Sequence, residues 1–120
     1  MRALRLYAGP AALSHLRNQG LQPDHVRAVP AAAGGPKGLV LGPLDRFLFG
    51  DWLPRSRQPV DLIGASIGAW RMATACLDQP VAAFERLSRD YIAQHYELPL
   101  GQKRPPPEHI SERFGASLQA

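Results

Sequence analysis

Apolar residues recur at intervals of three and four along much of the chain, which is the spacing of one helical face. The pattern predicts helices over residues 11–19, 37–49, 67–77 and 81–96. Gly20 and Gly50 are placed to stop the first two helices, and Pro43 is expected to kink the second or to delay its start. Pro80 suits the first position of the last helix, whose apolar face is the most regular of the four.

Two short runs rich in apolar and β-branched residues alternate with these helices. Residues 26–33 and 60–63 are expected to form strands, with Pro30 limiting how fully the first strand pairs. Residues 54–59, just before the second strand, are expected to form a basic loop. The order strand, helix, strand, helix predicts an α/β fold in which a parallel sheet is connected by helical crossovers.

The last part of the chain differs in composition from the rest. Residues 98–107 are rich in proline and are expected to form a linker, after which Ser111 is placed to cap a further helix. We therefore divide the chain into an α/β region, residues 1–97, and a loop with the start of a helix, residues 98–120. Two strands make an incomplete sheet, so the chain is expected to be the first part of a larger domain, with an exposed edge and one exposed apolar face.

The composition is that of an ordinary globular protein, because 45% of the 120 residues are apolar and 20% are charged. No run of eighteen apolar residues predicts a membrane span, and no sustained apolar segment follows the first arginines as in a secretory signal. The single cysteine, Cys76, excludes an internal disulfide and a cysteine-based metal cluster. These features favour a cytoplasmic location.

The net charge of +4 raises the question of an anionic partner. Because the basic residues are scattered and do not alternate with aromatic residues, the pattern disfavours nucleic acid and fits peripheral contact with an anionic membrane surface. Three of the four histidines, His15, His25 and His95, are dispersed along the sequence, which argues against a metal site. No cofactor is expected.

Gly64-Ala65-Ser66-Ile67-Gly68 matches the G-x-S-x-G motif of a nucleophile elbow, between a predicted strand and a predicted helix. A nucleophilic serine stands on a sharp, strained turn, and the residues two before and two after it approach so closely that glycine is required. The following helix directs its N-terminus at the serine and favours a developing negative charge. The alternative interpretation is an ordinary turn in which Ser66 is a helix N-cap.

A second glycine motif, Gly34-Gly35-Pro36-Lys37-Gly38, follows the first strand and opens the next helix. Backbone N–H groups without side-chain cover bind an anion there, and Lys37 adds a positive charge. The spacing excludes a Walker A loop and a dinucleotide-binding fingerprint. The remaining interpretations are an oxyanion or phosphate loop, or a tight turn in which Lys37 is a solvated charge.

The two motifs occupy equivalent positions in the predicted fold. Both follow a strand and precede a helix, so a parallel sheet brings them to the same edge, where sites form in such folds. An anion-stabilising loop beside an exposed serine is the minimal arrangement for acyl transfer. The pair of motifs therefore favours a serine esterase.

The combination of Gly-Gly-x-Lys/Arg-Gly with a G-x-S-x-G about thirty residues later resembles the patatin-like phospholipases, over residues 33–70. The resemblance implies a three-layer α/β/α sandwich, a Ser–Asp dyad without histidine, and acyl lipid or other ester substrates. Ser66 would be the nucleophile. The residues that the resemblance marks as the oxyanion loop are Gly34, Gly35, Lys37 and Gly38.

The chain departs from the family pattern at the start of the glycine loop. Ala32 and Ala33 stand where the family commonly has Asp and the first Gly, and Pro36 contributes no N–H group. The expected backbone donors of the oxyanion hole are Gly34, Gly35 and Ile67.

The catalytic aspartate of the family lies in an Asp-Gly motif, which does not occur in this sequence. We therefore expect the base to lie beyond Ala120. A triad of Ser66, Asp90 and His109 is disfavoured, since Asp90 falls in the middle of a predicted helix and His109 follows the proline-rich loop. The sequence thus favours a serine lipid acyl hydrolase, and the alternative is a non-catalytic fragment or an anion- or lipid-binding module that lacks the aspartate.

Overall fold

The computed structural model describes residues 4–94, 101 and 106–119. The chain divides into two compact units, Met1–Arg89 and Asp90–Ala120. The boundary expected from the sequence, between residues 97 and 98, lies outside the described residues.

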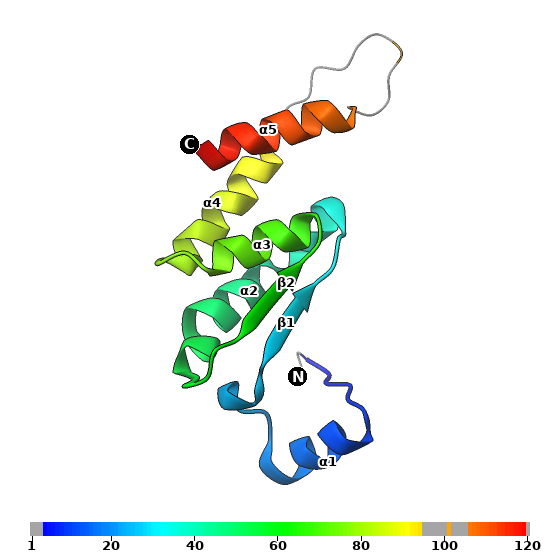
Figure 1. Ribbon diagram of the computed structural model, residues 1–120, viewed down its shortest axis with the longest axis vertical. Coiled ribbons are helices and arrows are strands. Elements are labelled where there is room, and N and C mark those ends of the chain that lie inside the picture. Colours follow the sequence, from blue (N-terminus) through cyan, green and yellow to red (C-terminus); the bar gives the residue numbers. More distant parts are fainter. Residues whose placement is uncertain (1–3, 95–100, 102–105, 120) are drawn as a thin grey trace. The chain divides into compact units, whose positions relative to one another are not determined.

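Figure 1 shows the elements of the chain. The helical segments of the first unit are, in order, α1 (Pro10–Gln19), η1 (Pro23–His25), η2 (Gly35–Leu41), α2 (Gly42–Phe47), η3 (Leu48–Trp52), η4 (Leu53–Arg55), α3 (Ile67–Ala75) and most of α4 (Pro80–Ile92). The strands are β1 (Ala28–Ala31) and β2 (Asp61–Gly64). The second unit contains the end of α4 and α5 (Pro107–Gln119). The protein is therefore of mixed α/β class, as predicted.

The two strands form a parallel pair in which Ala28 lies beside Asp61 and Ala31 beside Gly64. Just beyond the pair, the N–H of Ala65 donates to the carbonyl of Ala31 with an N···O distance of 3.1 Å. Helical segments connect β1 to β2, as the predicted crossover requires. The carboxyl ends of both strands consequently lie at one edge of the sheet.

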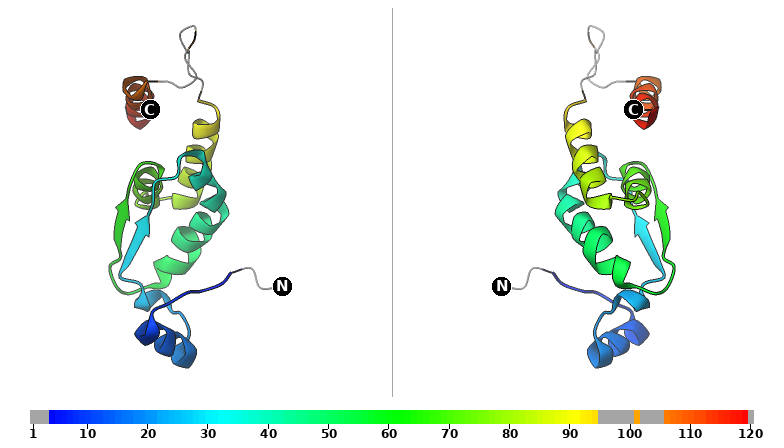
Figure 2. Two further views of the ribbon diagram at one scale, coloured as in Figure 1. Left: turned by 90° about the vertical axis from the view of Figure 1, so that its right-hand side faces the viewer. Right: turned by 90° about the vertical axis from the view of Figure 1, so that its left-hand side faces the viewer.

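The strands present different side chains to their two faces. Val29 and Leu62 pack against the core, whereas Pro30 and Ile63 are exposed, with Ile63 at 61% of its full accessible surface. This alternation is the expected pattern for strands with one buried face. Figure 2 shows α2 and α3 on the same side of the strand pair. Within the described residues of the first unit, helices therefore cover one face of the sheet.

The core of the first unit is small and draws one residue from each of four elements. Its buried apolar cluster consists of Ala31, Phe49, Met72 and Phe84, from β1, η3, α3 and α4. The rings of Phe49 and Phe84 stack with their centroids 5.8 Å apart. A side chain on Gly50 would collide with Val81, so the absence of a Cβ there lets α4 approach η3 closely.

The helix expected over residues 37–49 is assembled differently from the prediction. A 3₁₀ segment runs to Leu41, and the α-helix starts only at Gly42, with Pro43 in its first turn. Pro43 thus delays the start of the α-helix, one of the two expected effects. The expected stop at Gly50 is wrong, because helical structure continues through a π-helical turn and η4 to Arg55. Gly50 serves helix packing and not termination.

Other helix boundaries agree more closely with the sequence. Gly20 ends α1 with a φ of 71°, and Pro80 begins α4. The end of the predicted helix, residues 95–96, lies outside the described residues. In the second unit, Ser111 does not cap α5: the helix begins at Pro107, and the Ser111 hydroxyl donates to the Pro107 carbonyl one turn earlier.

A buried ion pair joins α2 to α3. Nε and Nη2 of Arg71 donate to the two carboxylate oxygens of Asp45 at 2.6 and 2.7 Å, and the two side chains are only 9% and 3% exposed. The hydrogen bonds that Arg71 donates to Asp45 raise the pKa of the guanidinium above its ordinary value, so the arginine stays charged despite its burial. The fork geometry permits both bonds only at one relative position of the two helices.

A second ion pair ties η1 to the loop before β2. The carboxylate of Asp24 accepts from the backbone N–H of Arg57 at 2.8 Å and from its guanidinium at 2.9 and 3.2 Å. The backbone hydrogen bond, followed by the side-chain bonds, lowers the pKa of Asp24 below its ordinary value of 3.8. A carboxylate whose pKa is lower in the folded state stabilises the fold above the unfolded pKa, and this stabilisation is lost as the pH falls through the folded pKa.

Replacing Asp24 with Asn is therefore expected to destabilise the protein near neutral pH and to have progressively less effect below about pH 4. Denaturant unfolding of both proteins at a series of pH values measures this difference. Asp78→Asn is the control, because Asp78 is exposed. A difference between Asp24→Asn and the unmodified chain that stays constant down to about pH 2 would contradict the assignment.

Candidate active site

The turn from β2 to α3 has a strained backbone at Ser66. Its φ of 54° and ψ of −128° make it the one non-glycine residue with a positive φ among those the structure describes. Such a conformation costs on the order of 1–3 kcal/mol and persists only where the surrounding structure enforces it. Ser66 is exposed, so the strained turn presents its hydroxyl to solvent. This is the backbone arrangement of a nucleophile elbow.

The two glycines of the motif explain how the turn is possible. A Cβ on Gly64 would lie 2.5 Å from the backbone of Ala69 in α3. A Cβ on Gly68 would collide with the backbone carbonyl of Ala31 at the end of β1 and lie 2.8 Å from that of Ala32. Both positions therefore require glycine for steric reasons, as the G-x-S-x-G spacing predicts.

The alternative interpretation of Ser66 as a capping residue does not describe the structure. Ser66 occupies the N-cap position of α3, but its side chain makes no capping hydrogen bond. An N-cap serine normally accepts a hydrogen bond from the second or third N–H of the helix and does so from an extended backbone. Neither feature is present, so the conformation of Ser66 is not explained by helix capping.

The first turn of α3 leaves one N–H group next to Ser66 open. The N–H groups of Gly68 and Ala69 donate to the carbonyls of Ala65 and Ser66 at 2.9 Å. Within the described part of the chain, the N–H of Ile67 makes no backbone hydrogen bond. This donor at the positive end of the helix dipole is suited to an oxyanion formed at Ser66.

The glycine loop lies at the end of β1. Gly35 begins η2 with a φ of 54°, a conformation that favours glycine, and Gly34 precedes it with an extended φ of −170°. Their N–H groups make no backbone hydrogen bond to any described residue. Pro36 contributes no donor, and Lys37 is exposed, whereas Gly38 is buried.

The loop and the elbow are in direct contact. A Cβ on Gly38 would lie 2.8 Å from Cγ2 of Ile67, so the absence of a side chain lets η2 pack against the first residue of α3. Ile67 itself is only 2% exposed. The predicted convergence of the two motifs at the carboxyl edge of the strands is therefore present, with open N–H groups on both sides of the contact.

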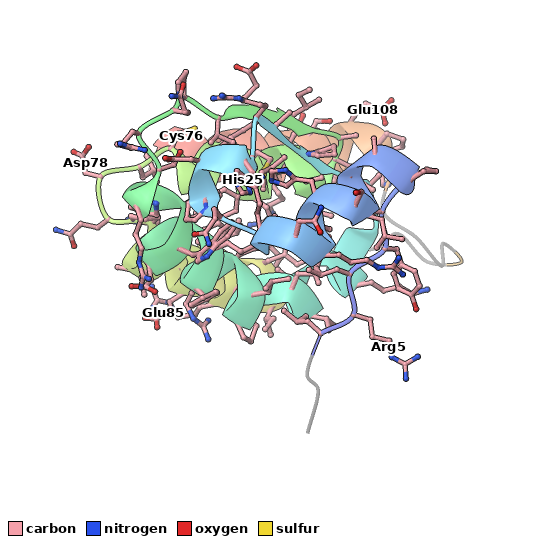
Figure 3. All side chains as sticks on the ribbon, turned by 90° about the horizontal axis from the view of Figure 1, so that it is seen from below. Arg5, His25, Cys76, Asp78, Glu85 and Glu108 are labelled. Atoms are coloured by element: carbon pink, nitrogen blue, oxygen red, sulfur yellow. The ribbon has the colours of Figure 1, made fainter. Side chains whose placement is uncertain are left out.

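None of the aspartates in the described part of the first unit makes a hydrogen bond to Ser66. Three aspartates of this unit pair with arginines: Asp24 with Arg57, Asp45 with Arg71 and Asp51 with Arg55. Asp61 begins β2 at the opposite edge of the sheet, and Asp78 points outward in Figure 3. Asp90 and His109 belong to the second unit, where they lie within α4 and α5. In the described structure the hydroxyl of Ser66 has no carboxylate or imidazole as a partner.

His15 and His25, which are ten residues apart in the sequence, lie together in the structure. Nε2 of His15 is 3.1 Å from Nδ1 of His25, and the same Nδ1 accepts from the N–H of Gln22. The contact joins α1 to η1, which depends on tertiary packing and not on sequence spacing. Among the described residues, no group of three or more metal-ligating side chains is present.

A pocket of about 370 Å³ adjoins His25, which Figure 3 labels. Its lining residues are Gln22, Pro23, Asp24, His25, Trp52 and Arg55. These residues belong to segments that precede β1 and β2, so the pocket lies at the amino edge of the strands. It is therefore separate from the elbow at the carboxyl edge.

Comparisons of the chain with protein-family models, with curated proteins and with solved structures find no match. None of the helices in the described residues is long and apolar enough to cross a membrane. The function is therefore inferred from the geometry of the site.

Replacing Gly68 with Ala is expected to destabilise the fold by about 1–3 kcal/mol, because the added methyl group overlaps the end of β1. Chemical denaturation measures the loss. The matched control is Gly115→Ala in α5, where a Cβ meets nothing within 4 Å, and this variant is expected to be as stable as the unmodified chain or more so. Equal stability of the two variants would contradict the close approach of α3 to β1.

Proposed function

We propose that this chain carries the nucleophile and the oxyanion loop of a serine acyl hydrolase of the patatin type. The observation that carries the proposal is the backbone of Ser66, strained at φ 54° and enclosed by two sterically required glycines. Strain of this kind is retained at functional sites, and no capping role accounts for it. The contact of the elbow with the glycine loop supplies the second component that acyl transfer requires.

The proposed reaction begins with attack of the Ser66 Oγ on the carbonyl carbon of an ester. The carbonyl oxygen becomes an oxyanion, which accepts hydrogen bonds from the N–H of Ile67 and from those of Gly34 and Gly35. The bond to the alcohol then breaks, and the alcohol leaves with the proton taken from Ser66. Water hydrolyses the acyl-enzyme and restores the serine. Lys37 and Gly38 complete the loop, the former as an exposed positive charge.

The reaction needs a base to accept the Ser66 proton. The resemblance to patatin-like phospholipases assigns that role to an aspartate in an Asp-Gly motif, and we propose that this aspartate lies beyond Ala120. In the same proposal, the exposed face of the sheet that carries Pro30 and Ile63 is covered by a second helical layer, which would complete the α/β/α sandwich.

Acyl lipids are the proposed substrates. Two apolar side chains of η2 are exposed in the unit that contains Ser66: Val40 at 79% and Leu41 at 41%. Exposed apolar side chains together with a net charge of +4 suit contact with an anionic lipid surface. The scattered basic residues do not suit nucleic acid. The proposed location is the cytoplasm.

A second candidate is a non-catalytic module that binds an anion or a lipid through the same loop. The observation that favours it is the lack of a carboxylate or imidazole partner at Ser66 within the described residues. This candidate does not explain the strain at Ser66, because an anion-binding loop does not need an exposed, strained serine. We therefore place the hydrolase first.

Treatment of the full-length protein, which carries the proposed aspartate, with a fluorophosphonate, followed by measurement of the intact mass, tests the proposal. One adduct is expected on the unmodified protein, mapped to Ser66 by peptide analysis, and none on Ser66→Ala. Ser14→Ala, which removes an exposed serine of α1, is the control and is expected to react like the unmodified protein. A full-length protein that gives no adduct, or a Ser66→Ala variant that reacts equally, would contradict the proposed nucleophile and favour the non-catalytic module.

A further inference from the structure

Two contacts on one face of α3 connect it to the segment that follows the glycine loop. Ile67, the first residue of α3, packs on Gly38 of η2. Arg71 lies four residues later and binds Asp45 of α2 through two hydrogen bonds. Positions i and i+4 lie one above the other on a helix, so both contacts come from the same side of α3. The nucleophile helix is thus attached to the loop segment at its start and again one turn further along.

The two contacts constrain α3 in different ways. The apolar contact between Ile67 and Gly38 has no preferred direction, so it limits how closely the elements approach but not how they slide. The ion pair between Arg71 and Asp45 is directional, because both N–H groups must point at their oxygens at 2.6 and 2.7 Å. Its burial removes the water that would otherwise satisfy a displaced guanidinium. The pair therefore fixes the position of α3 along its own axis.

A shift of α3 along its axis would be transmitted to Ser66. Only Ala65 and Ser66 separate the end of β2 from the start of α3. The N–H of Ala65 is held by the carbonyl of Ala31, so the strand side of the turn is anchored to β1. Ser66 is left to absorb any displacement, and its unfavourable φ would relax as soon as the helix was free to move.

We propose that Asp45 and Arg71 are positioning residues for the nucleophile. Their bidentate bond holds α3 in the register that keeps Ser66 in its strained conformation and keeps the N–H of Ile67 beside the Gly34–Gly35 loop. The effect on reactivity rests on the proposed function, whereas the effect on the conformation of Ser66 does not. Neither residue touches the substrate in this proposal.

The test replaces the pair by apolar residues of similar size in the double variant Asp45→Leu/Arg71→Met. Exchange of a buried ion pair for packed apolar side chains is often neutral for stability, so this variant separates folding from positioning. The matched control is Asp51→Leu/Arg55→Met, which removes an exposed pair of the same residue types at 2.6 Å. Arg71→Lys, which retains the charge but not the fork, is the second test variant.

Two measurements are made on each variant of this chain: the thermal unfolding midpoint, and the strong intraresidue NOE between HN and Hα that marks a positive φ at Ser66. The third, the rate of fluorophosphonate labelling, is measured with the same substitutions in the full-length protein that carries the proposed aspartate. For Asp45→Leu/Arg71→Met we expect a cooperative unfolding transition, loss of the Ser66 NOE and labelling slowed by roughly 10²-fold. The control pair is expected to leave the NOE and the labelling rate unchanged.

A double variant that keeps the Ser66 NOE and the original labelling rate would overturn the proposal and leave the pair a purely structural role. If the double variant does not fold, the result for Arg71→Lys is used instead. A folded Arg71→Lys variant with an unchanged Ser66 NOE and an unchanged labelling rate overturns the proposal. A folded variant with a weakened NOE and slower labelling supports it. If the full-length protein without substitutions is not labelled, the proposed hydrolase function fails, and the NOE alone decides whether the pair positions Ser66.

Discussion

The close approach of α3 to the carboxyl end of β1 is the constraint on which the rest of the first unit depends. Gly68 touches the backbone of Ala31 and Ala32, and Gly64 touches the backbone of Ala69, with no room for a side chain at either contact. At this separation the chain between β2 and α3 must reverse within two residues, which forces Ser66 to a positive φ. The strained serine is therefore a consequence of how tightly helix and strand pack, and a looser packing would remove it.

Glycine permits this approach but supplies no attraction, so other interactions must hold α3 in place. The apolar cluster around Met72 stabilises the packing of α3 but does not fix its orientation. The buried ion pair of Arg71 with Asp45 adds directional hydrogen bonds, which do. The exposed pair of Arg55 with Asp51 has the same short distance, yet it competes with water and stabilises little. The buried pair can therefore fix the position of a helix, whereas the exposed pair contributes little to the structure.

The sequence predicted the elements whose causes are local. The elbow and the helix stop at Gly20 follow from steric limits that act within a few residues, and apolar spacing placed α1, α3 and α4. Prediction from the sequence failed where the role of a residue depends on a distant part of the chain. Gly50 was expected to end a helix, but its lack of a side chain makes room for Val81 of α4. The ion pair of Asp45 with Arg71 was likewise not predicted from the sequence. A charged residue on the otherwise apolar face of each of two helices could have suggested that they pair.

The position of Ser66 also limits where a base would approach under the proposed function. The β1 side of the serine is occupied by the glycine loop, whose Gly38 packs directly on Ile67. Within the described residues, β2 pairs with β1 alone, so its other edge is the side on which backbone hydrogen bonds remain to be made. A segment that paired there in parallel would end at the same edge as Ser66, and a carboxylate following it would face the hydroxyl from the side opposite the oxyanion loop. Attack, oxyanion binding and proton removal would then each come from a separate strand end.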